Sequence, residues 1–310
     1  MPSMFPDRLL GRRVVVRFRR PAQDGRPPLS DVVGQLISVT SDTVTVRGRD
    51  GDRTVPRSSV VLARPVGASR REILELARIS RLGWRPEHAD EFGGWLLHAD
   101  AGWTGRANSV LPVATPSRPL GELLDAARRF YAGHGLPVQV QVPLPARGLL
   151  DAELAGRCWR LERPTVVLTR PLAPADPVGA PAVRLATEPD DDWLAAYHYR
   201  GGALPESARR LLVRHERVAF AAVRDGDRTV AIGRGAVDQG WLGVTAVEVA
   251  PEHRRQGLGS AVMAALGDWG RAHGAHAAYL QVDDGNPAAL ALYDRLGFTE
   301  HHRYHYRIEP

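Results

Sequence analysis

An internal repeat constrains the fold of this 310-residue chain more than any other feature of its sequence. The segment LGELLDAARRFYAGHGLPVQVQV (120–142) parallels LGSAVMAALGDWGRAHGAHAAYLQV (258–282), and LDAELAGRCWRLERPTVVLTR (150–170) parallels LALYDRLGFTEHHRYHYR (290–307). The His-Gly pairs that begin at 134 and 273 are 139 residues apart, and Cys158 and Gly297 have the same separation. This constant offset predicts two homologous units.

Each unit has the hydrophobic pattern of an α/β domain, with a helix, a group of strands, and then a helix, a strand, a helix and a strand. In the second unit the pattern predicts helices over 190–201, 205–216, 259–273 and 286–297, and strands over 217–225, 228–239, 241–250, 277–282 and 299–308. The proline-rich stretch RPLAPADPVGAPA (170–182) has the composition of a linker.

The first 65 residues have a different pattern. Short β-branched runs such as RRVVVRF and DTVTVRGR alternate with the turn-forming stretches PAQDGRPP, TSD and GRDGD. About five strands in so short a segment are typical of a small β-barrel. We therefore expect a barrel over 1–65, one α/β unit over 66–172 and a second over 181–310.

The net charge of +6 lies entirely in the predicted barrel. Residues 1–65 contain 12 Arg and 6 Asp, and the chain contains no lysine, so the remainder is neutral. A basic segment of this kind attracts nucleic acid or an acidic partner. Because no aromatic platform accompanies the arginines, we favour a solvated barrel surface, and nucleic-acid binding through residues 1–65 is the alternative.

Composition also excludes several protein classes. The single cysteine, Cys158, excludes an internal disulfide framework and a cysteine-based metal cluster. No apolar run approaches the roughly 20 residues of a membrane span, and MPSMFPDRLLGRR lacks the apolar core of a signal peptide. A cytoplasmic protein without a membrane partner is therefore expected.

The stretch EVAPEHRRQGLGSAV (248–262) carries the first chemical signal. A predicted strand ends there, two arginines and two glycines follow, and a helix begins. The first turn of a helix has unpaired N–H groups and a positive dipole end, and glycines let phosphates approach the backbone closely. The stretch matches neither a P-loop nor the dinucleotide fingerprint, so it predicts another kind of pyrophosphate site.

A second stretch, YLQVDDGNPAALALYDRLGF (279–298), follows about 20 residues later. Together, the two stretches and the strand order resemble the GNAT superfamily of acyl-CoA-dependent N-acyltransferases over residues 181–310. The whole layout is similar to a tandem actinobacterial group, some of whose members are labelled N-acetylglutamate synthase. This resemblance implies an N-acetyltransferase that uses acetyl-CoA as co-substrate and acts on a primary amine. A small amino acid such as glutamate is the favoured acceptor, and a protein or peptide N-terminus is the alternative.

The resemblance also assigns roles to individual residues. The pyrophosphate would be held by the loop residues Arg254, Arg255, Gln256, Gly257, Leu258, Gly259 and Ser260. The backbone of Val247 and Val249 would pair with the pantetheine arm and polarise the thioester carbonyl. Asn286 would bind the cofactor, and Tyr293 would protonate the departing thiolate.

The general base is less evident from the sequence. Positions where relatives carry a carboxylate are occupied here by Gly243 and Gln281, neither of which accepts a proton usefully. Glu248 is the nearest carboxylate and is our candidate base, although one of the two faces that strand alternation allows would direct it away from the substrate. A water chain that ends at a histidine or the backbone is the alternative. Acyl transfer needs no metal, so we expect none at the histidines of HHRYHYRI.

The first unit differs at the cofactor loop. Its VATPSRPLG (113–121) is two residues shorter than VAPEHRRQGLG, and Pro119 replaces an amide of the predicted cradle. We therefore predict that the first unit is degenerate and that the second is active. Arg106 and Asn108 would face the active unit and hold a substrate carboxylate, with a structural hydrogen-bond cluster as the alternative. Tyr304 is a further candidate for the acceptor pocket.

A hypothesis from another class remains open at this point. Gly243 and Gln281 are also compatible with a non-catalytic regulator that binds acyl-CoA and docks its barrel on nucleic acid or a partner. Tyr293 and the intact glycine loop favour the enzyme.

Overall fold

The computed structural model describes residues 9–20, 29–48, 50–172, 182–198 and 204–310. The chain divides into two compact units, Met1–Ala68 and Ser69–Pro310. The predicted linker lies mostly outside the described residues, as does the end of the helix predicted over 190–201.

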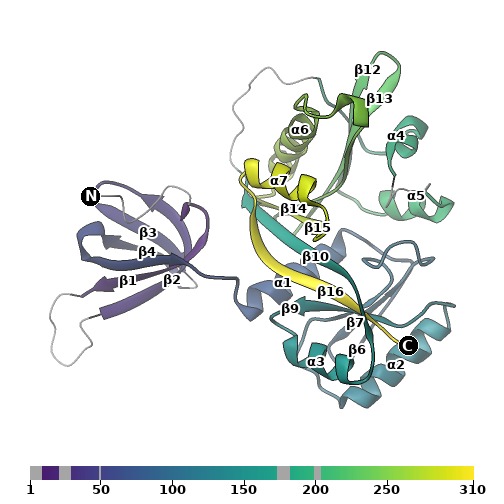
Figure 1. Cartoon of the computed structure of the whole chain (residues 1–310), viewed down its shortest axis with the longest axis horizontal. Helices are drawn as coiled ribbons and strands as arrows, with labels where there is room; N and C mark the ends of the chain where they lie inside the picture. The colour runs from purple at the N-terminus through teal and green to yellow at the C-terminus, as the bar shows by residue number, and fades with distance from the viewer. Residues whose placement is uncertain (1–8, 21–28, 49, 173–181, 199–203) are drawn as a thin grey trace. The chain divides into compact units, whose positions relative to one another are not determined.

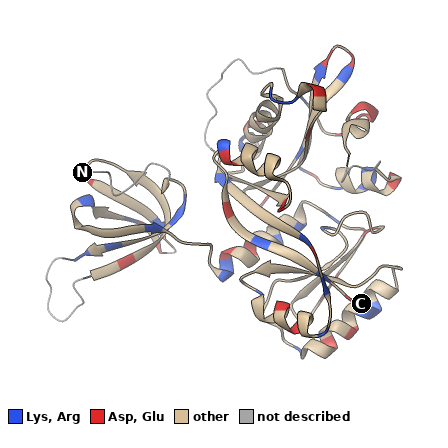
Figure 2. Cartoon of the chain, viewed as in Figure 1, with Lys and Arg blue, Asp and Glu red and all other residues tan. Residues whose placement is uncertain are grey.

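The N-terminal unit, Met1–Ala68, is a five-stranded antiparallel sheet with the order β4-β3-β2-β1-β5 (Figure 1). Its strands are β1 (Arg13–Arg19), β2 (Leu29–Val39), β3 (Thr43–Gly48), β4 (Gly51–Pro56) and β5 (Val60–Pro65). Alternate residues such as Val14, Val16, Val44 and Val46 are fully buried, as the pleat of a one-sided sheet requires. The opposite positions carry charges, and Figure 2 shows both signs on these strands.

The C-terminal unit, Ser69–Pro310, contains both copies of the repeat, which are called its first and second halves below. Its first half comprises α1 (Arg70–Leu82), β6 (His88–Phe92), β7 (Trp95–Ala99), β8 (Val110–Pro112), α2 (Leu120–Ala132), β9 (Gln139–Leu144), α3 (Gly148–Gly156) and β10 (Arg160–Pro171). Its second half comprises β11 (Arg184–Ala186), α4 (Asp191–Ala196), α5 (Glu206–Val213), β12 (Val218–Asp225), β13 (Arg228–Asp238), β14 (Trp241–Val249), α6 (Leu258–Ala272), β15 (Ala277–Asp283), α7 (Pro287–Arg295) and β16 (Thr299–Ile308).

The two halves share one eleven-stranded sheet with the order β11-β12-β13-β14-β15-β10-β16-β9-β8-β7-β6. Each half contributes its last strand to the other: β10 pairs with β15, and β16 pairs with β9. The two exchanged strands also pair with each other at the centre of the sheet (Figure 1). This exchange makes the two halves a single packed body. The sequence analysis did not predict it.

The ends of equivalent helices confirm the repeat at atomic detail. After α2, the ring of His134 packs on Phe130 at 4.8 Å between centroids, and its Nδ1 lies 2.8 Å from the Phe130 carbonyl. After α6, His273 has the same relations to Trp269, at 4.5 Å and 2.8 Å. Cys158 has a φ of 63°, and its repeat partner Gly297 has a φ of 78°. Cys158 therefore occupies a left-handed position that favours glycine.

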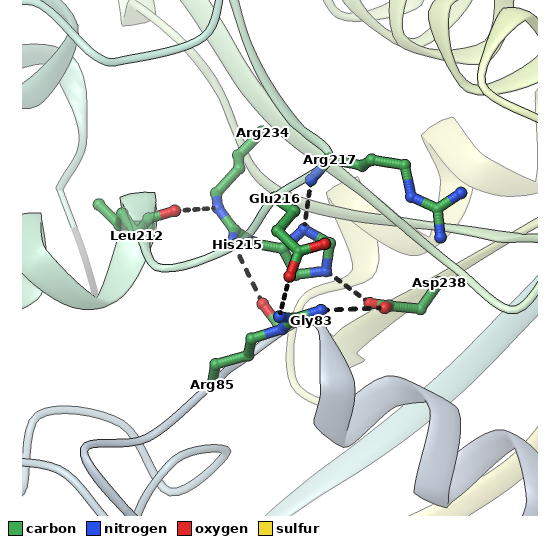
Figure 3. A network of polar contacts seen from close by, with 8 residues as sticks. All are labelled: Gly83, Arg85, Leu212, His215, Glu216, Arg217, Arg234 and Asp238. Atoms are coloured by element: carbon green, nitrogen blue, oxygen red, sulfur yellow. Dashed lines mark hydrogen bonds and ion pairs between the residues drawn. The ribbon is translucent and has the colours of Figure 1, made fainter.

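A buried polar network joins α1 of the first half to the second half (Figure 3). Arg234 on β13 is 1% exposed and donates from Nε to the Leu212 carbonyl (2.9 Å) and from Nη2 to the Gly83 carbonyl (3.2 Å). Burial lowers the pKa of Arg234 to about 10, so its guanidinium is still charged at neutral pH. This charge is held by carbonyl dipoles contributed by both halves.

Candidate active site

The two parallel strands β14 and β15 separate towards their C-terminal ends. They pair only from Trp241 to Val244 on β14, and the rest of β14 has no neighbouring strand on that side among the described residues. A bulge accompanies the separation, since Ala246 has a φ of 55° and the pairing of β14 with β13 shifts register there. The backbone around Val247 and Val249 therefore borders an opening in the sheet.

The two faces of the sheet differ at this opening. Val247 and Val249 pack into the core beneath α6 and α7. Glu248 is opposite Ile232, which packs on the other face against α4 and α5. There the Glu248 carboxylate accepts from the backbone N–H of His198 at 3.0 and 3.1 Å. Strand alternation therefore directs Glu248 to the sheet face away from α6 and α7, and Val247 and Val249 to the face beneath these helices.

The predicted phosphate loop leads directly into α6. Gly257 is the N-cap of the helix with a φ of 80°, and Arg255 also has a positive φ of 62°. Arg254 donates from Nε to the Val249 carbonyl (3.2 Å), which ties the loop to the end of β14. The loop residues up to Gly257 are exposed. Exposed arginines beside free helical N–H groups are suited to an anion.

The second glycine has a packing role. A Cβ added at Gly259 would lie 3.4 Å from Leu292 on α7 and 3.7 Å from Val249 on β14. The start of α6, the end of β14 and the middle of α7 therefore meet at Gly259. Both stretches that the sequence singled out form one corner of the fold.

Tyr293 lies on α7 beside Leu292 and packs its ring 5.8 Å from that of Phe298. It is 8% exposed, and burial raises its pKa to about 12. A phenol in this state keeps its proton at every physiological pH and can donate it. Asn286 is the N-cap of α7, where its Oδ1 accepts from the Ala289 N–H at 3.0 Å. Its cofactor contact stays a prediction.

A second group of residues meets on the face that carries Glu248. Arg106, from the β7–β8 loop of the first half, donates from Nε to Gln281 Oε1 at 2.6 Å. The Tyr304 hydroxyl donates to the same oxygen at 3.2 Å. Gln281 is opposite Val167 in the core formed with α1, which fixes its face. The exchanged strands thus bring residues from both halves to the end of β15.

A cavity of about 170 Å³ lies beside these residues. It is lined by Thr104, Gly105, Arg106, Arg163, Thr165, Asp283, Tyr304 and Tyr306. The Arg163 guanidinium stacks on the Tyr306 ring at 4.1 Å and hydrogen-bonds Gln139. The sequence analysis missed Arg163, whose position depends on the exchange of β10.

Asn108 differs from its prediction. It is 2% exposed, and its Oδ1 accepts from the N–H groups of Asp100 (2.6 Å) and Gly102 (3.0 Å) while its Nδ2 donates to the Thr104 carbonyl (2.8 Å). These contacts hold the loop that presents Arg106. They speak against a substrate contact and match the structural alternative.

Thr245 is a further residue that the sequence analysis did not select. It is opposite Arg234, on the same face as Glu248, and immediately precedes the bulge. Its Oγ1 is buried without a hydrogen-bond partner among the described residues. A buried hydroxyl without a protein partner is uncommon.

Comparison with known proteins supplies the family. Residues 70–307 match the family described as "Probable histone acetyltransferase Rv0428c C-terminal". The chain belongs to this family of GNAT N-acetyltransferases. Residues 8–64 match the "Rv0428c N-terminal Sm-like domain", which confirms the small barrel-like fold of the N-terminal unit.

Two relatives and one solved structure agree with this assignment. The chain is 33% identical to "Probable histone acetyltransferase Rv0428c" of Mycobacterium tuberculosis, over 96% of this chain and 94% of that protein. It is 29% identical to "Uncharacterized N-acetyltransferase YobR" of Bacillus subtilis, over 77% and 99%. A GCN5-related N-acetyltransferase from Kribbella flavida has the same fold, with a TM-score of 0.58 and 19% identity over 77% and 95%. Membership of an enzyme family favours catalysis over the regulator hypothesis.

Among the described residues, no helix combines the length and apolar character needed to cross a membrane. The His, Cys, Asp and Glu side chains of the same residues form no cluster of three that suits a metal ion.

The glycine loop of this GNAT protein allows a matched test. Gly257 and Gly274 flank α6 with φ values of 80° and 87°, and open space surrounds a Cβ at either position. Alanine at each should destabilise the fold by about 1–2 kcal/mol through backbone strain. Only Gly257→Ala should also raise the KM for acetyl-CoA, by about 10-fold, because it displaces the amides of the loop. Equal KM changes in steady-state assays of both variants would contradict a cofactor role for the loop.

Proposed function

We propose that the protein transfers the acetyl group of acetyl-CoA to the primary amine of a small acceptor that carries a carboxylate, such as the amino acid glutamate. The cavity lined by Arg106 and Arg163 is the observation that carries this proposal. Two guanidinium groups suit a carboxylate, and Asp283 in the same wall suits an ammonium group. The volume of about 170 Å³ favours a small acceptor.

The cofactor occupies the other side of the opening in this proposal. The loop from Arg254 to Ser260 holds the pyrophosphate, and the pantetheine arm runs along the unpaired backbone of Val247 and Val249. Asn286 contacts the cofactor at the start of α7. The thioester then lies in the gap between β14 and β15, where both faces of the sheet are accessible.

Transfer follows the ordinary chemistry of a thioester. The amine attacks the carbonyl carbon after losing a proton to Glu248, directly or through water held near Thr245. The Val247 N–H stabilises the oxyanion that develops on the carbonyl oxygen. When the tetrahedral intermediate collapses, the carbon–sulfur bond breaks and Tyr293 protonates the thiolate. The acylated nitrogen releases its remaining proton to solvent, and Tyr293 regains a proton from solvent.

A protein or peptide N-terminus is the second candidate acceptor. The support is the name of the Mycobacterium tuberculosis relative, a probable histone acetyltransferase. The basic barrel is the natural candidate for docking such a partner or a nucleic acid. Among its described arginines, Arg17 and Arg47 form ion pairs with Asp31 and Asp52 at 2.8 Å, which reduces the charge available.

The test is a panel assay of CoA release with amino acids, their amides, polyamines and peptides as acceptors. Turnover with an amino acid and not with its amide supports the proposal. Turnover only with peptides supports the second candidate, and no turnover with any amine contradicts both.

Arg106 tests carboxylate recognition directly. Arg106→Gln should raise the KM for an amino-acid acceptor by about 10-fold or more and leave the KM for acetyl-CoA unchanged, because a charged hydrogen bond to the acceptor is lost. Arg303→Gln is the control, since Arg303 lies on the same strand as Tyr304 but pairs on the surface with Glu300 and Asp284. If Arg106→Gln raises the KM for an amino acid and for its amide by the same factor, Arg106 does not bind the carboxylate.

A further inference from the structure

The first half of the repeat has its own version of the cofactor corner. The strands β8 and β9 and the starts of α2 and α3 correspond to β14, β15, α6 and α7. β8 pairs with β9 at one position only, Val110 with Val140, so these strands also separate. Pro119 is the N-cap of α2, where the second half has Gly257. The corner keeps its opening but has lost its phosphate loop.

A cavity of about 460 Å³ occupies this corner. Leu120, Leu123, Pro145 and Leu150 line it, and most of its wall is apolar. Leu149, also in the wall, is 89% exposed. The volume lies within the range of about 300–1,000 Å³ that is typical of small-molecule sites. The second half places its predicted pantetheine cleft at the equivalent position.

Two residues of this wall carry buried donors. Trp95 is 1% exposed, and its indole Nε1–H has no hydrogen-bond partner among the described residues. Trp95 is opposite Pro112, whose carbonyl accepts from Arg147 Nε at 2.8 Å. Arg147 is 5% exposed and lines the same cavity. An unpaired buried donor is costly, so the site lacks an acceptor that a ligand can supply.

The charges around the cavity indicate which hydrogen-bond acceptor a ligand would supply. A second hollow, of about 740 Å³, shares Arg70 and Arg147 with the cavity and adds Arg71 and Arg78, against Glu75 as its one acidic lining residue. The cavity itself has Glu153 as its one acidic lining residue, against Arg70 and Arg147. A negatively charged group is therefore favoured where the two spaces meet, beside Arg70 and Arg147. The leucine-lined remainder suits a hydrocarbon chain.

We propose that this cavity binds a monocarboxylate with a medium-length hydrocarbon chain. The carboxylate accepts from Trp95 Nε1 and from the Arg147 guanidinium, and the chain lies against Leu120, Leu123 and Leu150. The degenerate half thus keeps the corner as a site for an apolar anion. This binding is independent of the acetyl transfer proposed for the second half.

The test is calorimetric titration of the full chain with decanoate. Saturable 1:1 binding is expected, with decanol at least about 10-fold weaker because it lacks the charge. Trp95→Phe should weaken decanoate binding by about 10-fold and lower thermal stability less than Trp193→Phe does, since both variants shrink a buried ring but the Trp95 indole N–H pairs with no protein group. Leu150→Trp should abolish binding by filling the cavity.

Trp193→Phe is the matched control. The Trp193 indole is also buried, but its Nε1 donates to the Ala221 carbonyl at 3.0 Å, so this variant should lose stability and keep its decanoate affinity. Saturating acetyl-CoA should not displace decanoate. Absence of saturable binding, unchanged affinity in Trp95→Phe, or displacement by acetyl-CoA would each overturn the proposal.

Discussion

Tyr293→Phe is expected to lower kcat by about 100-fold and to leave the KM for acetyl-CoA nearly unchanged. A positioned general acid contributes roughly 10²–10⁴ to a rate, and the variant keeps the ring that packs on Phe298. Its loss should therefore appear in the chemical step. Steady-state kinetics with the acceptor identified by the panel assay measures both constants.

The pH dependence of the wild type gives a second measurement. Burial raises the pKa of Tyr293 to about 12, so the phenol stays protonated from acidic pH up to roughly pH 11. Below about pH 11, ionisation of Tyr293 should therefore not lower the wild-type kcat. Any alkaline decline in this range should appear in Tyr293→Phe as well. A decline near pH 9 that disappears in the variant would mean that the phenol ionises far more easily than its burial implies.

Tyr131→Phe is the control for a tyrosine change as such. Tyr131 is fully buried in the first half, where its hydroxyl donates to the His98 carbonyl at 3.0 Å. Its loss should cost about 1 kcal/mol of stability and leave kcat unchanged. The acid role of Tyr293 is wrong if Tyr293→Phe retains a third or more of the wild-type kcat.

Arg234→Ala is expected to lower the free energy of unfolding by about 3–5 kcal/mol. The change leaves the buried carbonyls of Leu212 and Gly83 without their charged donor and opens a cavity beside Trp84. For a unit of this size the loss corresponds to a fall of roughly 10 °C in Tm. Thermal and urea unfolding measure it, and the acetyl-CoA KM should change little at temperatures where the variant is folded.

Arg224→Ala is the control for removal of an arginine. Arg224 pairs with Asp192 on the surface, where both side chains are more than a third exposed. An exposed pair of this kind contributes about 0–1 kcal/mol, so Tm should fall by no more than a few degrees. If both variants lose the same stability, the buried network of Figure 3 is not what joins the halves.

Local patterns predicted the strands and helices of the proposed cofactor corner because its residues are close in sequence. EVAPEHRRQGLGSAV contains the end of β14 and the start of α6, and YLQVDDGNPAALALYDRLGF contains the end of β15 and α7. The repeat spacing also predicted the equivalence of Cys158 and Gly297, which the backbone angles confirm. Propensity, capping and glycine conformation act over a few residues, so sequence is enough to identify them.

The residues of the proposed acceptor face could be predicted only in part. Arg106 and Tyr304 were candidates from the sequence, Arg163 and Thr245 were not, and Asn108 holds the loop that presents Arg106. Gln281 was judged only as a missing base, whereas it accepts hydrogen bonds from Arg106 and Tyr304. These contacts join residues 23 to 175 positions apart, and no local signal marks them.

The sequence by itself determined the small β-barrel, the two homologous units and the strand–loop–helix corner, because each depends on short-range periodicity and backbone preference. Only the tertiary structure decided that β10 and β16 exchange places, that Arg106 meets Gln281, and that Glu248 faces away from α6. The physical reason is that either half offers equivalent strand edges to β10 and β16. The choice between them depends on the side chains buried when the whole eleven-stranded sheet forms, which is a property of the packed chain.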